Sequence, residues 1–409
     1  MTDIGIIGGG ASGIMSAISA KEHNPDATVY VFERSPKCLK KLLSTGNGRC
    51  NLLNLNAKEE NYHGEDTKKA FEIIKKASPE FMYDFFESLG LKLSKRFFPL
   101  VYPNSFQASS VREALLTAAY DRGVKILTDF EIVNVKKEDD LFILTNKKGR
   151  TEKVKKLIIS GGTSATSGSD SAVAFLKEFS HKIVPYYPAL SPLVLKENVK
   201  IADGARAFAT LTLYDEEKEV KKDSGEIQFT DYGISGIVTM QLSGECLELI
   251  QKGKSPVISV SFFDKSEKDY LIKTLKTAKQ KWSNKPCLSA LSFIINSSVA
   301  KLILAFLKIS ESMLFSDISE WEIEKIADTL LDLRLTPVCS KGEKFSQVFG
   351  GGVCLSCFDE NLHSKIADGL YVTGEMLDVY GDCGGYNLTW AWATGYIAGK
   401  HASESIIEG

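Results

Sequence analysis

The stretch Ile4–Glu33, with the sequence IGIIGGGASGIMSAISAKEHNPDATVYVFE, decides the fold. Its apolar start predicts a buried parallel strand, and the apolar residues after Gly13 recur at helical spacing. Between strand and helix stands the pattern G-x-G-x-x-G, formed by Gly8, Gly10 and Gly13. The first glycine permits a tight turn, the second lets a pyrophosphate approach the backbone, and the third lets the helix pack on the strand. The stretch therefore predicts a βαβ unit that binds a dinucleotide.

A carboxylate follows at the expected distance. The second predicted strand, Thr28–Phe32, ends at Glu33, about 20 residues beyond the last glycine. A carboxylate at this position accepts hydrogen bonds from the ribose hydroxyls and repels a 2′-phosphate. We therefore expect the adenosine ribose of the ligand to be unphosphorylated, with its phosphates at the N-terminus of the helix.

Composition excludes several classes of protein. The chain has 409 residues, 50 Lys and Arg against 52 Asp and Glu, and a net charge of -2, which is typical of a soluble protein with two or three domains. We expect no nucleic-acid partner, because we identify no basic block. We also expect no membrane span, because no apolar stretch reaches roughly 18 residues. The first residues lack the basic start of a signal peptide, so we expect a cytoplasmic protein.

The eight cysteines are scattered, which suits a reducing compartment better than a disulfide framework. Only Cys354 and Cys357 have the spacing of a functional pair. A zinc site needs a second such pair, and the sequence has none, so we expect no metal. We expect the two cysteines to be small buried or half-buried residues on a strand.

A polar loop follows the first βαβ unit. In the segment 44–51 two glycines flank Asn47, and Ser, Thr, Arg and Asn side chains crowd together. Such a loop offers many hydrogen bonds, so we predict that it contacts a ligand. A purely structural loop is the alternative.

Periodicity then predicts a mixed domain. We expect a helical segment over Asp66–Leu89 with a break at Ser78–Pro79, and a helix over Ser109–Asp121. Three short strands between Lys125 and Thr145 predict a β-meander, and Lys156–Ser160 predicts another buried strand.

The second half changes character. Prolines at 185, 188 and 192 mark a linker, Leu193–Gln228 alternates like antiparallel strands, and Ser266–Leu335 is helical. A late strand ends at Gly374 and Glu375, and Gly384-Gly385 precedes a last helix expected over Thr389–Ser403. Two glycine-rich helix entries, at opposite ends of the sequence, fit the two ends of an extended dinucleotide.

These motifs together resemble the two-domain FAD-binding flavoproteins of the glutathione reductase type. Within that class, further motifs resemble the aminoacetone oxidase-like (BaiN/YhiN-like) family of bacterial NAD(P)/FAD-dependent oxidoreductases. They are Lys41–Ser44, Gly46–Asn51, Gly351–Val353 and Gly374–Asp378. The segment Gly161–Asp170 departs from the family pattern, because it is short and lacks a proline.

The resemblance implies an α/β fold. It implies an FAD-binding Rossmann-like domain over residues 1–187 and 346–409. An antiparallel, barrel-like β domain for the substrate (188–265 and 336–345) and a small helical subdomain (266–335) are expected to be inserted. The cofactor is expected to be non-covalent FAD. The residues expected to contact it are Gly8, Gly10, Ala11, Ser12, Gly13, Glu33, Arg34, Lys41, Gly46, Asn47, Gly48, Arg49, Cys50, Asn51, Val133, Gly161, Gly162, Gly374, Glu375, Asp378, Gly385, Tyr386, Asn387 and Leu388.

Catalytic residues are less clearly marked in the sequence. Backbone N–H groups of Tyr386, Asn387 and Leu388 would stabilise negative charge on reduced flavin. Ser44, Asn47 and Tyr386 are candidates for orienting a substrate, although Tyr386 equally fits packing at a helix start. The five histidines lie outside the motifs, and we expect those that follow helices, such as His181, to be surface cations.

The resemblance implies an oxidoreductase with a small-molecule substrate. The first hypothesis is an oxidase of a small amine or amino ketone, which passes electrons from FAD to oxygen and forms peroxide. The alternative is an NAD(P)H-dependent reductase of a carbon–carbon double bond, as in dehydro-bile-acid reductases. The absence of a second G-x-G-x-x-G favours the oxidase. A third hypothesis is a non-enzymatic flavin-bound or RNA-associated protein, for which a basic surface is expected.

Overall fold

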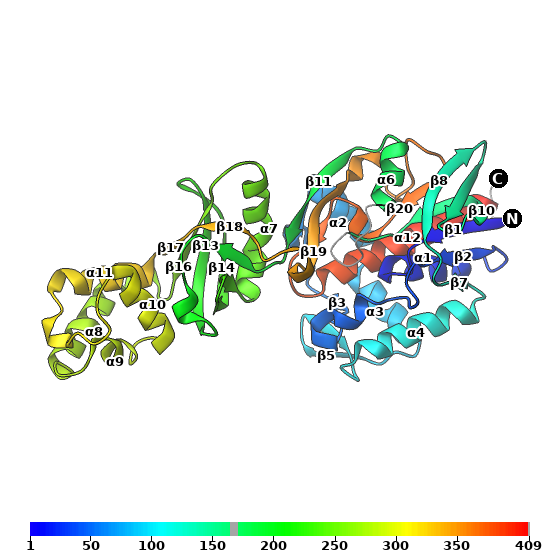
Figure 1. The fold of residues 1–409 in the computed structure, drawn as a ribbon. Helices are drawn as coiled ribbons and strands as arrows, with labels where there is room; N and C mark the ends of the chain where they lie inside the picture. The colour runs from blue at the N-terminus through cyan, green and yellow to red at the C-terminus, as the bar shows by residue number, and fades with distance from the viewer. Residues whose placement is uncertain (164–170, 408–409) are drawn as a thin grey trace. The chain divides into compact units, whose positions relative to one another are not determined.

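The computed structural model describes residues 1–163 and 171–407, and it divides the chain into two compact units (Figure 1). The first unit comprises Met1–Tyr186 and Phe349–Gly409, and the second comprises Tyr187–Val348. Residues 164–170 of the segment that departs from the family pattern lie outside the described residues. The chain passes between the units in the strands β11 (Ile183–Ala189) and β19 (Val348–Val353), which pair with each other.

The first unit is built on a seven-stranded sheet with the order β7-β2-β1-β10-β9-β8 and with β20 (Leu370–Val372) beside β10. Strand β1 (Thr2–Ile7) lies between β2 (Val29–Phe32) and β10 (Thr151–Ile159) and runs parallel to both. The predicted βαβ start is therefore confirmed, with helix α1 (Ala11–His23) between the first two strands.

The predicted three-stranded meander is wrong in its first strand. Strand β7 (Lys125–Leu127) pairs in parallel with β2 at the edge of the sheet. The antiparallel part consists of β8 (Ile132–Glu138), β9 (Leu141–Asn146) and β10. A strand that returns from a helix, here α4 (Ala108–Asp121), enters a sheet in parallel, so the hairpin begins only after β7.

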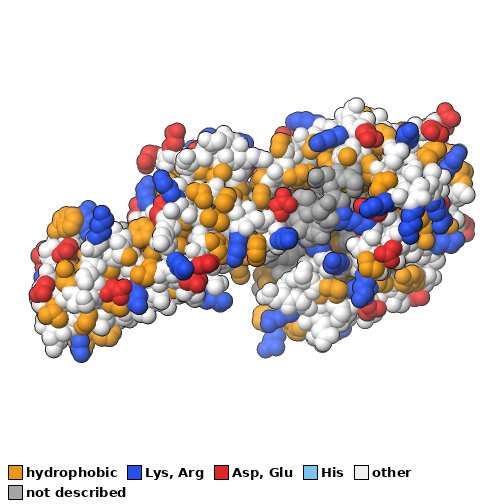
Figure 2. Space-filling view, in the orientation of Figure 1, with side chains coloured by type: hydrophobic (Ala, Val, Ile, Leu, Met, Phe, Trp, Pro, Cys, Tyr) orange, Lys and Arg blue, Asp and Glu red, His pale blue; other side chains and the backbone are white. Residues whose placement is uncertain are grey.

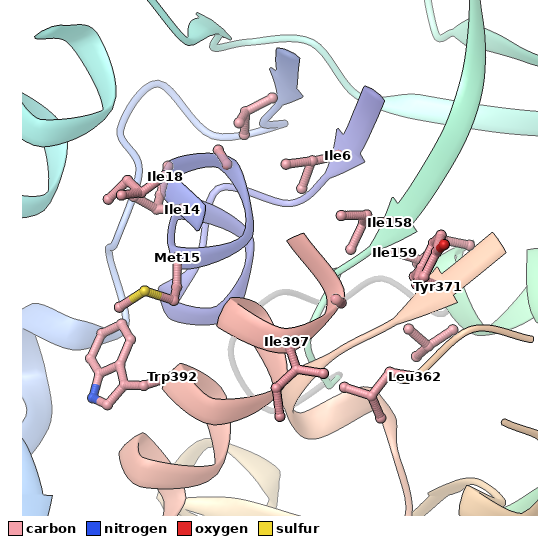
Figure 3. Packing of buried hydrophobic residues seen from close by; sticks show 14 of the residues in the cluster. Ile6, Ile14, Met15, Ile18, Ile158, Ile159, Leu362, Tyr371, Trp392 and Ile397 are labelled. Atoms are coloured by element: carbon pink, nitrogen blue, oxygen red, sulfur yellow. The ribbon is translucent and has the colours of Figure 1, made fainter. Parts of the chain in front are cut away.

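The first and last helices of the chain pack very closely (Figure 3). Helix α12 (Tyr386–Ile407) presents Gly395 and Gly399 to the backbone of α1. A Cβ atom at Gly395 would lie 2.4 Å from the Ser12 carbonyl oxygen, and one at Gly399 would lie 2.2 Å from that of Ser16. No larger residue fits at either position without moving a helix. The helices that follow the two glycine-rich entries are thus packed backbone to backbone in one core.

The helical segment that was predicted after the polar loop is confirmed, with its break. It forms α2 (Thr67–Lys76) and α3 (Pro79–Ser88), and the Ser78 hydroxyl caps α3 by accepting a hydrogen bond from the Phe81 N–H at 3.2 Å. The other elements of the unit are η1 Leu42–Gly48, β3 Leu53–Asn54, β4 Tyr62–His63, β5 Leu93–Phe97, β6 Leu100–Pro103, α6 Ser171–Glu178, η8 Gly374–Met376 and β21 Tyr380–Gly381.

The second unit is an antiparallel sheet with helices that share its hydrophobic core. The strand order is β17-β16-β13-β14-β15-β12-β18. Its strands are β12 Leu193–Leu195, β13 Arg206–Asp215, β14 Lys218–Thr230, β15 Gly233–Ser235, β16 Val257–Ser261, β17 Leu333–Leu335 and β18 Pro337–Ser340. Its helices are α7 Ile237–Gln251, α8 Lys268–Lys281, α9 Cys287–Leu291, α10 Ser297–Leu307 and α11 Glu320–Leu331.

The strand predicted for the cysteine pair is wrong. Strand β19 ends at Val353, and Leu355–Cys357 is a turn of 3-10 helix. Cys354 is buried, Cys357 is half-buried, and both are free thiols. No helix in the described part of the chain is long and apolar enough to cross a bilayer.

Candidate functional site

The entry of α1 combines two crowded glycines with one open glycine. Gly8 has a φ of +105°, and a Cβ atom there would lie 2.4 Å from the Ser160 carbonyl oxygen. A Cβ atom at Gly13 would lie 2.0 Å from the carbonyl oxygen of Gly8, whereas one at Gly10 would meet nothing within 4 Å. Packing therefore requires Gly8 and Gly13, while the space at Gly10 lies open beside the N–H groups of the first helical turn.

A small cavity lies beside this entry. Its lining residues are Ile7, Gly8, Phe32, Glu33, Arg34, Phe130, Glu131, Ile132, Gly161 and Ala172. The Glu33 carboxylate accepts hydrogen bonds from the N–H groups of Gly9 and Ser35, both at 2.7 Å. Its two oxygens keep further lone pairs for a ligand. Val133, which was predicted to contact the cofactor, does not line the cavity; it lies at an irregularity of β8 with its side chain exposed.

Four predicted contact residues from three distant segments meet at the start of α1. Glu375 lies on η8, and both of its oxygens are 2.6 Å from the Lys41 ammonium group. The turn that carries Glu375 is fixed by helix α12, because Thr394 accepts a hydrogen bond from the Gly374 N–H at 3.0 Å. A Cβ atom at Gly374 would lie 2.7 Å from the Ser12 hydroxyl. The structure thus brings Ser12, Lys41 and the Gly374-Glu375 pair together.

The polar loop contains exposed and buried residues. Asn47 and Arg49 are exposed, and the Ser44 hydroxyl donates to the Lys41 carbonyl oxygen at 2.8 Å. Cys50, which was expected to contact the cofactor, is instead fully buried, and burial raises the pKa of its thiol to about 12. Its side chain belongs to the hydrophobic core of the first unit.

The entry of α12 is as crowded as that of α1. Gly385 has a φ of +94°, and a Cβ atom there would lie 2.8 Å from the Leu53 carbonyl oxygen and 3.0 Å from Asn51 Oδ1. That Asn51 oxygen is buried and has no hydrogen-bond partner among the described residues. A buried unpaired oxygen is costly in an isolated protein, so it marks a place where a ligand can donate a hydrogen bond.

The Asn387 side chain is used inside the protein. Its Oδ1 accepts from the Gly381 N–H at 2.8 Å, and its Nδ2 donates to the Gly381 carbonyl oxygen at 2.7 Å. Only the backbone N–H of Asn387 is therefore placed to face a ligand. Asp378 is similarly committed, because it is buried and its Oδ2 accepts from the Glu65 N–H at 3.0 Å.

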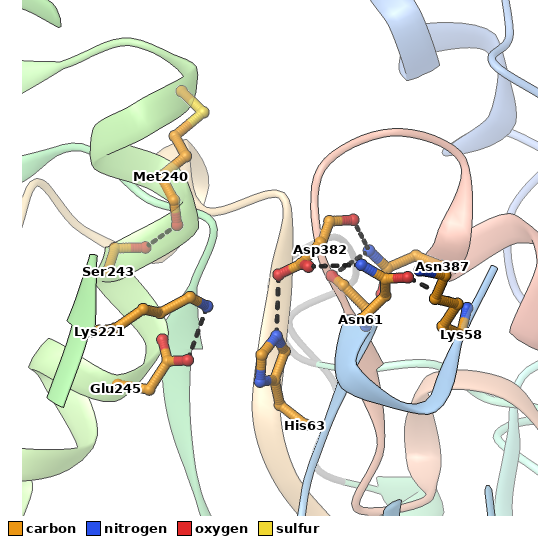
Figure 4. Close-up of polar contacts among 10 residues, drawn as sticks. Lys58, Asn61, His63, Lys221, Met240, Ser243, Glu245, Asp382 and Asn387 are labelled. Atoms are coloured by element: carbon orange, nitrogen blue, oxygen red, sulfur yellow. Dashed lines mark hydrogen bonds and ion pairs between the residues drawn. The ribbon is translucent and has the colours of Figure 1, made fainter. Parts of the chain in front are cut away.

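A histidine to which the sequence assigned no role lies at this entry (Figure 4). His63 Nε2 is 2.8 Å from Asp382 Oδ1, and Asn61 donates to the other Asp382 oxygen at 3.3 Å. Strand β4 brings His63 there by pairing with β21, where His63 lies opposite Tyr380. His63 and Asp382 are 319 positions apart, so no local motif reveals the pair.

Two phenols stand in the same cluster. Burial first, and then the Asp382 carboxylate, raise the pKa of Tyr386 above its ordinary value. Tyr62 is buried beside it, with the two rings edge to face at 6.0 Å, and burial raises its pKa as well. Both hydroxyls therefore keep their protons at neutral pH and can donate hydrogen bonds.

His181 does not have the expected surface position. It is buried, stacks on Phe358 and lies 2.8 Å from the Ser364 hydroxyl. Burial lowers its pKa, so a neutral imidazole is favoured over the predicted surface cation. The expectation failed because the chain turns back after the exposed end of α6 and places the His181 ring against Phe358 of the core.

A family model described as HI0933-like protein Rossmann domain matches residues 2–401. The chain belongs to this HI0933-like family. Over 412 residues it is 37% identical to the 3-dehydro-bile acid delta(4,6)-reductase of Clostridium scindens, covering 99% of this chain and 100% of the relative. It is 24% identical to the ribosomal RNA dihydrouridine synthase of Haemophilus influenzae, covering 96% of each chain.

The fold of this HI0933-like protein also matches a solved structure. Escherichia coli quinol fumarate reductase superposes with a TM-score of 0.50 at 15% identity, covering 100% of this chain and 71% of the other. The predicted FAD-binding Rossmann-like fold is confirmed, and the protein is an FAD-dependent oxidoreductase. Neither the bile acid reductase nor the dihydrouridine synthase is an amine oxidase, so the aminoacetone oxidase assignment finds no support in these two relatives.

The site fits FAD. The open space at Gly10 accommodates a diphosphate, and Glu33 lies at a cavity beside it for the adenosine end. The unpaired Asn51 oxygen and the first turn of α12 lie together at the second entry.

Proposed function

We propose that this protein is a reductase that saturates a carbon–carbon double bond conjugated to a carbonyl group, with NADH or NADPH as electron donor. The whole-length relationship to a 3-dehydro-bile acid delta(4,6)-reductase carries this proposal. It supports the reductase, which was the alternative hypothesis, better than the amine oxidase.

The second relative supports the same chemistry on another substrate. A 3-dehydro bile acid with double bonds at positions 4 and 6 is an extended enone, and the dihydrouridine of the second relative's name is uridine saturated beside a ring carbonyl. Both reductions add hydrogen across a bond polarised by a carbonyl. We take such an enone as the substrate class and a 3-oxo steroid diene as the first substrate to test.

The chain holds FAD at both helix entries. The N–H groups of Ala11 and Ser12 beside Gly10 would bind the diphosphate, and Glu33 would accept the ribose hydroxyls. The Lys41–Glu375 ion pair would flank the ribityl chain. When bound, FAD supplies the hydride. Backbone N–H groups of Tyr386, Asn387 and Leu388 would stabilise negative charge at the α12 entry.

The reaction also consumes a proton, and the α12 entry holds protons. The Asp382 carboxylate accepts a hydrogen bond from Nε2 of His63, which fixes the orientation of the ring, and the Tyr386 hydroxyl carries a proton at neutral pH. We assign proton supply to this cluster, with Asp382 orienting His63. Ser44 and Asn47 stay predictions as substrate-orienting residues.

Anaerobic spectroscopy tests the proposal. NADH or NADPH should bleach the oxidised-flavin absorbance, and a 3-oxo-4,6-diene steroid should restore it with formation of the saturated product. Aminoacetone should leave the flavin oxidised. Bleaching by aminoacetone, with no bleaching by either nicotinamide, would overturn the reductase and restore the oxidase. Substitution of uridine for the steroid separates the two substrate classes.

A further inference from the structure

One segment of the second unit contains basic residues and no acidic ones. Residues 270–310 contain seven lysines and no aspartate or glutamate, although the whole chain has a net charge of -2. The lysines are Lys273, Lys276, Lys279, Lys281, Lys285, Lys301 and Lys308. The segment covers most of α8 and all of α9 and α10. The near-neutral total, from which we expected no nucleic-acid partner, therefore hides a local basic region.

One face of α8 lines a shallow groove, called the α8 groove below. The lining residues are Tyr270, Lys273, Thr274, Thr277, Ala278, Lys281, Trp282, Phe293 and Ile294. The helical positions recur every three or four residues, so they form one stripe. The opposite face of α8 buries Leu271 and Leu275 in the core. Of the lining residues, Ala278 and Ile294 also pack against this core, and the others form a surface outside it.

Large aromatic side chains are exposed in the α8 groove. Tyr270 is 68% exposed, Phe293 is 63% exposed and Trp282 is 41% exposed. The rings of Trp282 and Phe293 lie 5.3 Å apart. A contiguous patch of exposed apolar side chains marks an interaction site, and flat rings beside cations suit nucleobases.

The lysines of the α8 groove differ from their neighbours on the same helix. Lys268 pairs with Asp328 and Lys276 pairs with Glu320, both at 2.6 Å. Among the residues that the structure describes, no carboxylate pairs with Lys273 or Lys281. The groove therefore presents two uncompensated positive charges between exposed rings.

The threonine hydroxyls of the stripe favour a polyanion that can donate a hydrogen bond to them. Thr274 Oγ1 donates to the Tyr270 carbonyl oxygen and Thr277 Oγ1 donates to that of Lys273, both at 2.9 Å. Their hydroxyl protons are thus used within the helix, and only acceptor lone pairs face outward. A phosphate has no proton to give them at neutral pH, whereas a ribose 2′-hydroxyl does.

We propose that the α8 groove binds single-stranded RNA. Bases stack on Trp282, Phe293 and Tyr270, while Lys273 and Lys281 contact the phosphates. This inference goes beyond the proposed reductase, because RNA binding needs no turnover and no flavin contact. If the groove does not bind RNA, the reductase proposal is unaffected. If the protein is not a reductase, the RNA-binding proposal is equally unaffected.

The test uses full-length, FAD-loaded protein and fluorescein-labelled oligo(U) of about 12 nucleotides, a length suited to such sites. Fluorescence anisotropy should show salt-dependent binding. The double variant K273Q/K281Q should weaken binding about 10-fold and reduce the slope of log affinity against log salt by about 1.4, because each phosphate contact contributes about 0.7. K268Q/K276Q removes the same charge outside the groove and should change affinity less than about 2-fold.

The contribution of base stacking is tested with one variant in the groove and one control variant outside it. Trp282→Ala should weaken oligo(U) binding about 5- to 150-fold, the effect of losing one base–aromatic stack. Trp321→Ala removes an equally large exposed ring from α11 and should have no effect. Thr277→Val should reduce the preference for oligo(U) over oligo(dT). Circular dichroism and flavin absorbance confirm that each variant is folded.

Several results would overturn the proposal. They are no oligo(U) binding by the wild type, equal losses in the groove and control doubles, or oligo(dT) bound as tightly as oligo(U). Binding to anionic vesicles but not to oligo(U) would assign the groove to a membrane surface. A concentration-dependent dimer that Trp282→Ala abolishes, without oligo(U) binding, would assign it to a second copy of the chain.

Discussion

The two glycine-rich helix entries of the first unit differ in how they are built. The α1 entry is shaped by its backbone, because Gly8 and Gly13 are tightly packed and the space at Gly10 is open. The α12 entry is shaped by side chains. Asn387 hydrogen-bonds to the backbone of the preceding turn, and His63 and Asp382 form a pair beside that turn. Phosphates need only N–H groups and room, whereas a reaction that consumes protons needs titratable groups. The residues that form the first entry can therefore lie close together in the sequence, whereas those that form the second come from distant segments.

Gly13→Ala should have the largest effect, because it breaks the α1 entry. The new methyl group would lie 2.0 Å from the Gly8 carbonyl oxygen, so helix and strand must separate. We expect a loss of about 1–3 kcal/mol in the free energy of unfolding and loss of most bound FAD. Thermal unfolding and flavin absorbance measure both. Gly10→Ala is the control, since it should weaken FAD retention without loss of stability; a stable, fully loaded Gly13→Ala protein would contradict this account.

Asp382→Asn should break the α12 entry functionally while FAD stays bound. Without the carboxylate, His63 loses the hydrogen-bond acceptor that orients its ring. We expect reoxidation of reduced flavin by the enone to slow on the order of 100-fold, with a changed pH profile. Stopped-flow absorbance measures the rate. Tyr386→Phe serves as the comparison, because it removes one phenolic proton and keeps the ion pair; an unchanged rate in both variants would remove the cluster from the mechanism.

Lys41→Met should weaken FAD binding, with a smaller effect than the two variants above. The variant leaves Glu375 without its cation at a position where both side chains are partly buried. Because the pair is partly exposed, we expect a cost of about 1 kcal/mol, or several-fold weaker FAD binding. Equilibrium dialysis of FAD measures it. Lys40→Met, one residue earlier on the exposed side, is the control.

Replacement of His181 should have the smallest effect of the four, and it concerns the pH dependence of stability away from both helix entries. Burial lowers its folded-state pKa below the ordinary 6.5, so the unfolded chain binds more protons in the interval between the two values. Its contribution to stability is complete above pH 6.5 and is lost as the pH falls through the lower folded value. Urea unfolding of His181→Asn should show a shallower loss of stability below pH 6.5 than the wild type. A wild-type curve that is flat over this range would contradict the lowered pKa.

Much of the first unit was readable from the sequence. The strand, glycine turn and helix at residues 4–23 are confirmed, as is the break between α2 and α3, because glycine spacing and helix caps act over a few residues. The β7 pairing, the buried Cys50 thiol and the buried His181 were missed. Each depends on which distant segment lies opposite, and local patterns do not specify that.

The sequence by itself determined that an FAD-type βαβ unit opens the chain and that a second glycine-rich helix entry closes it. Both are encoded in contiguous residues, because glycines supply the positive φ and the close backbone approach that each turn requires. Only the tertiary structure decided that His63 meets Asp382 and that Lys41 meets Glu375. It also decided that two lysines without a carboxylate partner among the described residues share one face of α8 with exposed rings. Charged and apolar side chains are interspersed over the face of the molecule that Figure 2 shows. Those contacts follow from strand pairing and helix packing, which are settled by the whole core rather than by any one stretch.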